Sequence, residues 1–327
     1  MTTTYRIGRR ACLAGLATAS AGVVVGRTLS RFSDTEGDSG SLTTGAWSAC
    51  RAVYTDSGAL ASATQTGGVT TYGVDAVDVL GPVESGFSGS EYHVPVVDGN
   101  SDMLLVAADG TESTFGVDSK KTPRGSKARL ATATWNGHPL SVYYPGSNES
   151  KLFRVAPGEK SKWVSKPSNG IKAAVGTGDI NGDGAAEFCF VDGSATIRYI
   201  VPSGTNNERD VRSTGQSVGS NNNYGIGAPS TVEGYGMVMP AVNGSGGLGL
   251  LGADGWAEKS LTDGSTARKT AVHACDFDDD GATEIVFAGY SNGYLEYLDD
   301  VGGTNDVVTV GTDAGDPIPV DSKRGVH

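Results

Sequence analysis

A strand-and-turn pattern recurs at intervals of about 47 residues through most of this chain. In one register it stands as Val96-Val97-Asp98-Gly99, Tyr143-Tyr144-Pro145-Gly146, Phe190-Val191-Asp192-Gly193, Ala241-Val242-Asn243-Gly244 and Ala288-Gly289-Tyr290-Ser291. The third members lie at positions 98, 145, 192, 243 and 290, so the intervals are 47, 47, 51 and 47 residues. An earlier, shorter copy is Tyr54-Thr55-Asp56-Ser57-Gly58, 42 residues before Asp98. Six units of this kind fill nearly the whole chain after residue 40.

The units are predicted to consist of β-strands. The chain contains 49 glycines among its 327 residues, and no segment beyond residue 30 shows a convincing 3.6-residue apolar period. In the first unit we expect a strand over 50–54, a turn at 56–58 and a return strand over 59–63. The second unit repeats this pattern over 93–97 and 103–107. In the fourth unit a strand is expected over 196–201, followed by an irregular stretch over 204–223.

Repetition predicts how these units pack. A unit of about 47 residues with three or four short strands cannot bury its own apolar face, whereas several units around one axis bury each sheet against the next. The predicted fold class is therefore all-β: a β-propeller of six blades over residues 41–327, closed into a ring by the C-terminal segment. A ring of seven blades and an open array are the alternatives.

Two acidic loops have the composition of a cation site. Each has oxygen-bearing side chains at its first, third and fifth positions, a glycine at its sixth and a glutamate at its ninth. A hard cation such as calcium takes six to eight oxygen ligands, and a tight loop can turn alternate side chains inward to supply them. The seventh residue is expected to add a backbone carbonyl. The predicted ligands are Asp179, Asn181, Asp183, Ala185 and Glu187 in the first loop, and Asp276, Asp278, Asp280, Ala282 and Glu284 in the second.

These loops, in a repeat of this length, resemble the FG-GAP/VCBS family, the blades of integrin α-chain heads and of many exported microbial proteins. The resemblance covers roughly residues 45–327. It implies a propeller whose loops hold calcium at one rim. Four of the six units lack the acidic residues, the ninth position is Glu rather than the commoner Asp, and family members usually have seven blades.

Residues 1–30 differ from the rest of the chain. Arg9-Arg10 precedes an Ala- and Gly-rich apolar run over 11–26, and the first acidic residue is Asp34. This pattern resembles a twin-arginine export signal. The sequence allows two fates for this segment: cleavage near Ala19 or Ala21, or retention as an uncleaved membrane anchor. Residues 31–40 are a predicted linker, and the mature chain is expected to be extracellular or at the cell surface.

The net charge limits the classes of partner that the chain can bind, and the cysteines limit its disulfides. The formal charge is −12, the isoelectric point is about 4.7, and the sequence has no basic stripe, which argues against nucleic acid as a partner. Contact with a membrane is expected only through an N-terminal segment that stays uncleaved. Cys189 is predicted to be a small buried hydrophobe, whereas a disulfide between Cys50 and Cys275 stays an alternative.

The sequence predicts a binding module. It has no Gly-x-Ser-x-Gly motif and no pair of histidines at zinc-ligand spacing, so we expect that the chain is not an enzyme. We expect a calcium-stabilised binding or structural module whose partner is a protein or a glycan at the cell surface. A glycan-binding propeller lectin is the alternative, and an enzyme built on a propeller is the less favoured one.

Overall fold

The computed structural model describes residues 51–327 except 77, 80–92, 99, 101, 108–109, 116–122, 124–129, 147–150, 157, 203–209, 221–223, 260–265, 271, 279, 300, 302–304, 313, 321–325 and 327. The predicted export signal, the linker and Cys50 lie outside the described residues. Every regular element of the described part is a strand. That part therefore contains no helix long and apolar enough to cross a membrane.

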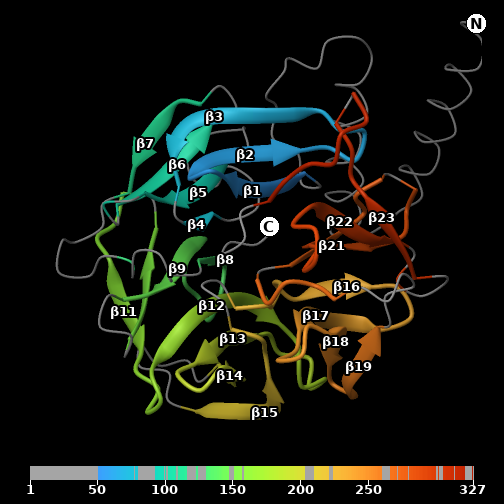
Figure 1. The fold of residues 1–327 in the computed structure, drawn as a ribbon. Coiled ribbons are helices and arrows are strands. Elements are labelled where there is room, and N and C mark those ends of the chain that lie inside the picture. The colour runs from blue at the N-terminus through green and yellow to red at the C-terminus, as the bar shows by residue number, and fades with distance from the viewer. Residues whose placement is uncertain are drawn as a thin grey trace, which may run out of the picture. The chain divides into compact units, whose positions relative to one another are not determined.

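Six antiparallel sheets follow one another along the chain and surround a common centre (Figure 1). The first sheet contains β1 (Ala52–Asp56), β2 (Ala59–Ala63) and β3 (Val69–Asp75). The second contains β4 (Asp78–Val79), β5 (His93–Val97), β6 (Met103–Ala107) and β7 (Glu112–Thr114). The third contains β8 (Ala131–Ala133), β9 (Ser141–Pro145), β10 (Leu152–Val155) and β11 (Lys162–Ser165).

The last three sheets repeat this arrangement. The fourth contains β12 (Ile171–Gly178), β13 (Glu187–Asp192), β14 (Thr196–Ile200) and β15 (Val211–Ser217). The fifth contains β16 (Ser230–Val232), β17 (Gly236–Val242), β18 (Leu248–Gly252) and β19 (Gly255–Lys259). The sixth contains β20 (His273–Cys275), β21 (Glu284–Ala288), β22 (Leu295–Asp299) and β23 (Asp306–Thr309). The predicted six-bladed β-propeller is confirmed.

The 47-residue period marks the same hairpin turn in every sheet. In three sheets the Oδ1 atom of an Asp or Asn at this turn accepts hydrogen bonds from the backbone N–H groups two and four residues later. These turns begin at Asp98 (2.9 and 2.7 Å), Asp192 (2.8 and 3.0 Å) and Asn243 (2.8 and 3.0 Å). The side chain thus satisfies turn amides that the strands leave unpaired, which explains why the pattern repeats in this register.

Apolar side chains fill the space between neighbouring sheets. On β14, Ile197 packs with Met239 of the fifth sheet, whereas Ile200 packs with Tyr143 of the third. Successive residues of a strand point to opposite faces, so one strand contributes to two interfaces. Cys189 is fully buried in the first of these clusters, as predicted, and burial raises the pKa of its thiol.

The C-terminal segment joins the two ends of the ring. The Leu295 N–H donates to the Ile318 carbonyl over 2.8 Å, and the Val320 N–H donates to the Gly293 carbonyl over 2.8 Å, so this segment pairs with the sixth sheet. Ile318 and Val320 are buried in the cluster that includes Tyr54 of the first sheet. The segment therefore closes the ring by packing between the first and sixth sheets.

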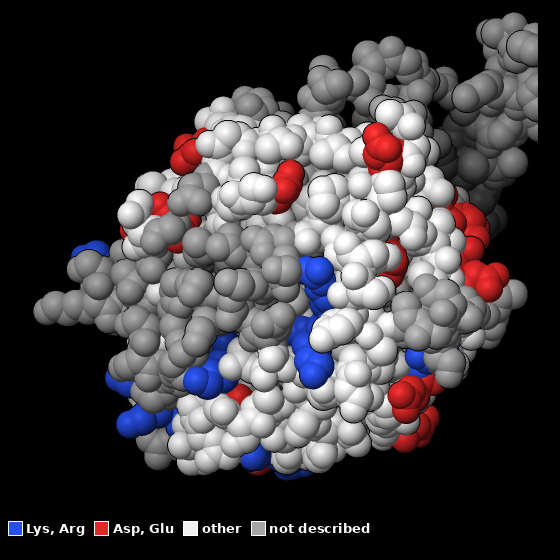
Figure 2. All heavy atoms as spheres, in the orientation of Figure 1, with Lys and Arg blue, Asp and Glu red and all other residues white. Residues whose placement is uncertain are grey.

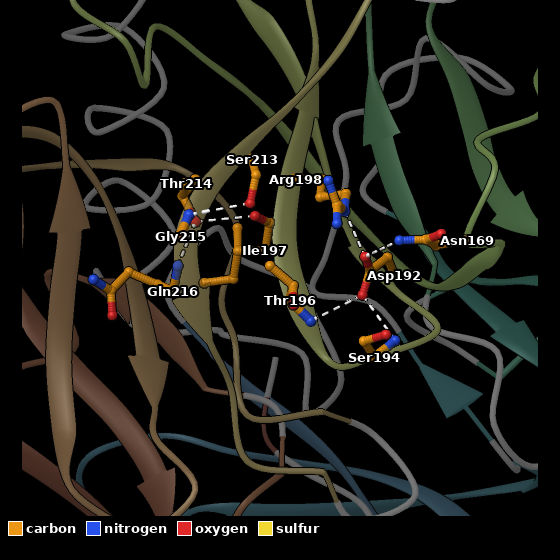
Figure 3. Close-up of polar contacts among 10 residues, drawn as sticks. All are labelled: Asn169, Asp192, Ser194, Thr196, Ile197, Arg198, Ser213, Thr214, Gly215 and Gln216. Carbon is orange, nitrogen blue, oxygen red and sulfur yellow. Dashed lines mark hydrogen bonds and ion pairs between the residues drawn. The ribbon is translucent and has the colours of Figure 1, made fainter.

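One strand lies where an irregular stretch was predicted. β15 falls inside 204–223 and is the outermost strand of the fourth sheet (Figure 1). It needs no apolar face because its side chains lie largely in solvent. Its polar side chains satisfy its own bulge: Ser213 Oγ and Thr214 Oγ1 accept from the N–H groups two residues on, at 3.2 Å each (Figure 3). The prediction was wrong because Ser, Thr and Gly suit this edge strand as well as a loop.

Candidate metal centre

The two acidic loops occupy equivalent places in two sheets. The first joins β12 to β13, and the second joins β20 to β21. The glutamate at the ninth position begins the following strand in both, because Glu187 pairs with Gly178 and Glu284 pairs with Cys275. Both glutamates are fully buried, so the ninth ligand enters each loop from a rigid strand.

The first loop is closed by hydrogen bonds from its own backbone. Asp179 accepts from Gly184 N at 2.9 Å, Asn181 Oδ1 from Asp183 N at 2.9 Å, Asp183 from Ala185 N at 2.9 Å, and Glu187 from Ile180 N at 3.1 Å. Gly184 has a φ of 88°, where an L side chain is strained, which explains the glycine at the sixth position.

The second loop repeats this pattern. Asp276 accepts from Gly281 N at 3.2 Å, Asp278 from Asp280 N at 3.2 Å, and Asp280 from Ala282 N at 2.7 Å, while Glu284 accepts from Phe277 N. Gly281 has a φ of 98°. The matching bonds show that equal spacing in the sequence produces the same local fold in both loops.

The glutamates at the ninth positions differ in their partners. In the first loop the Asn181 side-chain amide donates to Glu187 Oε1 at 3.1 Å and to Asp183 Oδ2 at 3.0 Å. In the second loop the third position is Asp278, whose carboxylate offers no donor. The buried Glu284 Oε1 has no hydrogen-bond partner among the residues that the structure describes. A buried carboxylate oxygen without a partner is costly, so this atom is suited to serve as a cation ligand.

Burial shifts the acids of both loops. Desolvation raises the pKa of Glu284 to about 7 and also raises the pKa of Glu187. The N–H groups of Phe277 and Asp278 oppose the shift at Glu284, but neither completes a hydrogen bond to Oε1. Burial and then the charges of Asp280 and its acidic neighbours raise the pKa of Asp278. Such mutual repulsion is relieved when a divalent cation binds.

The second loop brings together more acids than its spacing predicted. One carboxylate oxygen from each of Asp276, Asp278 and Glu284 lies within 4.8 Å of the others. The same holds for Asp278, Asp280 and Asp299. Asp299 ends β22 and was missed, because it lies 15 residues beyond Glu284 in the sequence. Its strand pairs with β21, and only this pairing places it beside the loop.

Both loops are anchored in the interfaces between sheets. The second residue of each, Ile180 or Phe277, is buried in the cluster between its own sheet and the next. Phe277 also packs against Tyr297, with ring centroids 5.4 Å apart. Both belong to the cluster that includes Tyr54 of the first sheet. The second loop therefore lies at the interface that closes the ring.

A cavity of about 310 Å³ adjoins the first loop. Asp179 and Gly182 line it on one side, and turns of the fifth sheet line it on the other with the aromatic residues Tyr235 and Trp256. Asp254 adds a second carboxylate to its lining. The cavity combines aromatic surface with acidic groups, which suits a small polar ligand.

Charge on the described surface is uneven. On the face in Figure 2, acidic side chains gather toward the right of the view, on the side where Figure 1 shows the sixth sheet. Lysine and arginine side chains lie at the centre of the view and toward the lower left. A separate ion pair joins Lys162 to Glu159 over 2.9 Å on the third sheet.

No protein-family model matches the chain, and no curated protein matches it. Its fold is similar to solved structures that include a streptogramin B lyase (10% identity, 85% of this chain and 93% of the other, TM-score 0.49). A virginiamycin B lyase from Staphylococcus aureus is similar at 13% identity over 84% of this chain and 86% of the other, with a TM-score of 0.46. A luciferin-regenerating enzyme is similar at 13% identity over 84% of this chain and 93% of the other, with a TM-score of 0.47.

These similarities correct one prediction. Three of the similar structures are named as enzymes, so the prediction that this chain is not an enzyme is wrong as a deduction from its fold and motifs. The motif search was too narrow for such a conclusion, because rim loops far apart in the sequence can assemble a site on a propeller. At 10 to 13% identity, the neighbours assign no activity to this chain.

Proposed function

We propose that this chain is an exported β-propeller of the FG-GAP/VCBS kind whose acidic loops bind calcium, and that it serves as a binding or structural module. The observation that carries the proposal is Glu284 Oε1, which is buried without a partner beside the carboxylates of Asp276 and Asp278. Carboxylate oxygens are the ligands that calcium prefers. Ala185 and Ala282 are expected to contribute their carbonyl oxygens.

The position of the second loop supports a structural role for the cation. Phe277 belongs to the cluster that joins the first and sixth sheets. Calcium would hold the second loop, which contains Phe277, in one conformation. A cation that binds only the folded chain stabilises it by mass action, by about 1.4 kcal/mol at ten times the dissociation constant.

Calorimetric melting in calcium and in EDTA tests this proposal. The wild type should melt at a higher temperature in calcium, and Asp280→Ala should lose most of the part of that response that comes from the second loop. Asp306→Ala is the matched control, because Asp306 is an exposed acid of β23 outside both loops. A wild-type curve indifferent to EDTA would contradict calcium binding.

Export rests on Arg9-Arg10 and has its own test. Replacing both arginines with lysine keeps the charge but removes the pair that the receptor reads, so the variant should stay in the cytoplasm. Normal export of this variant would contradict the proposal.

The cavity beside the first loop supports a glycan as the second candidate partner. Tyr235 and Trp256 offer apolar ring surface, and Asp179 and Asp254 offer acceptors for hydroxyl groups. A glycan array with the wild type and Trp256→Ala tests this function. Binding lost in the variant would support it, and an array without any signal for the wild type would count against it.

A further inference from the structure

We infer that the two acidic loops are unequal calcium sites: the loop between β20 and β21 binds more tightly and takes Asp299 as an additional ligand. This inference rests on the proposed calcium binding and states how the two loops divide it. It starts from the third position, where the first loop has Asn181 and the second has Asp278.

In the first loop, a side chain of the loop itself donates hydrogen bonds to two of the carboxylate oxygens. The Asn181 amide donates to Glu187 Oε1 at 3.1 Å and to Asp183 Oδ2 at 3.0 Å. A cation that binds here must replace both bonds, and the amide must turn to present its oxygen. Calcium therefore competes with a group of the chain itself, which weakens its net binding.

Among the described residues of the second loop, no side-chain donor bonds to Glu284 Oε1 as the Asn181 amide bonds to Glu187 Oε1. Asp278 cannot donate, and the fully buried Glu284 Oε1 has no partner. A cation gains this oxygen without breaking a bond that the chain already makes. The Phe277 N–H offsets part of the desolvation of Glu284 through Oε2, and a cation bound at Oε1 would offset the rest.

Asp299 strengthens the second loop further. Ile285 pairs with Leu298, so Asp299 follows beside Glu284, and its carboxylate lies within 4.8 Å of those of Asp278 and Asp280. In the fourth sheet Phe188 pairs with Ile200, which places Val201 at the equivalent position. Valine has no ligand atom, so the first loop lacks this contribution.

The number of charges points the same way. Among the described residues, five carboxylates form two overlapping groups at the second loop: Asp276, Asp278, Asp280, Glu284 and Asp299. The first loop has three: Asp179, Asp183 and Glu187. Calcium affinity in loops of this kind is tuned by the number of charged ligands, so the second loop should fill first.

Calcium titration of the full chain by isothermal calorimetry, after removal of bound cations, tests the inference. The wild type should show a tight and a weak site. Asp299→Asn should weaken the tight site at least about tenfold and leave the weak site unchanged. Asp306→Asn is the control, because Asp306 pairs with Asp299 across β22 and β23 but lies outside the acidic groups.

Exchanging the third positions gives a test that misfolding cannot imitate. Asn181→Asp removes the competing donor and should tighten the weak site, whereas Asp278→Asn should weaken the tight one. Two equal sites in the wild type, or an Asp299→Asn titration identical to the wild type, would overturn the inference while calcium binding stands. No heat of binding in the wild type would overturn the proposed function itself.

Discussion

Asp192 and Glu284 show how the surroundings decide what a buried carboxylate does. Both are fully buried. Asp192 accepts from the Ser194 and Thr196 N–H groups, from Asn169 at 3.4 Å and from the Arg198 guanidinium (Figure 3). The charge of Asp192 is thus fully solvated by the protein. Glu284, by contrast, has one oxygen, Oε1, that accepts no hydrogen bond from the described residues and can bind a ligand.

Asp192→Asn should destabilise the fold by about 1 to 3 kcal/mol, since it removes the charge but keeps a turn acceptor. Asp192→Ala should cost more, because the turn is lost as well. Asn243 accepts the same two turn hydrogen bonds in the fifth sheet, so an asparagine at position 192 can also form this turn. Urea denaturation at neutral pH measures both variants, and equal losses would contradict separate roles for charge and turn.

The same pair predicts a pH dependence. Burial alone would raise the pKa of Asp192, but Arg198 and the turn amides outweigh it and hold the pKa below its ordinary value. The interaction therefore stabilises the fold above about pH 4, the pKa range of an unfolded aspartate, and is lost as the pH falls through the folded-state pKa. The stability difference between the wild type and Asp192→Asn should shrink over that acidic range, and a constant difference would contradict this origin.

At the scale of the element, each acidic loop has a glycine in a left-handed conformation at its sixth position. Gly184 and Gly281 have φ values of 88° and 98°, and a Cβ atom at either would meet no neighbouring atom within 4 Å. The obstacle to an alanine at either position is therefore the backbone conformation and not the available space.

Gly184→Ala and Gly281→Ala should each destabilise the fold by about 1 to 2 kcal/mol, the cost of a left-handed conformation. Each should also weaken calcium binding at its own loop. Gly244→Ala is the control, since Gly244 has equal space and no left-handed φ. Thermal melting with calcium titration measures both effects, and a Gly281→Ala variant as stable as the control would contradict the strain argument.

At the scale of the whole molecule, the ring depends on the contact between its two ends. Ile318 is 1% exposed and packs with residues of the first and sixth sheets. Gly67 of the first sheet lies against Gly311, so close that a Cβ atom there would be 2.0 Å from the Gly311 oxygen. The two ends are therefore in direct contact.

Ile318→Ala should lower the stability by about 2 to 5 kcal/mol, and deletion of residues 316–327 should lower it further. Val69→Ala is the control, because Val69 is 42% exposed. Calorimetric melting of the wild type, both variants and the control measures these losses of stability. A deletion that melts with the wild type would show that the C-terminal segment does not hold the ring closed.

The sequence alone determined the number of sheets and the local form of the loops, because both depend on residues close together in the chain. Turn residues at a fixed period predicted six hairpins, and the strands over 59–63, 93–97 and 103–107 lie where they were expected. The first strand was expected over 50–54 and runs over Ala52–Asp56, and residue 50 lies outside the described residues.

Only the tertiary structure decided what lies beside each loop. Strand pairing brings Asp299 to the second loop and Val201 to the corresponding place at the first, across gaps that no motif spans. Burial then leaves Glu284 Oε1 without a partner, while the Asn181 amide satisfies Glu187. Spacing along the chain fixes a turn, but the solvation of a carboxylate depends on every group packed around it, and those groups come from distant parts of the sequence.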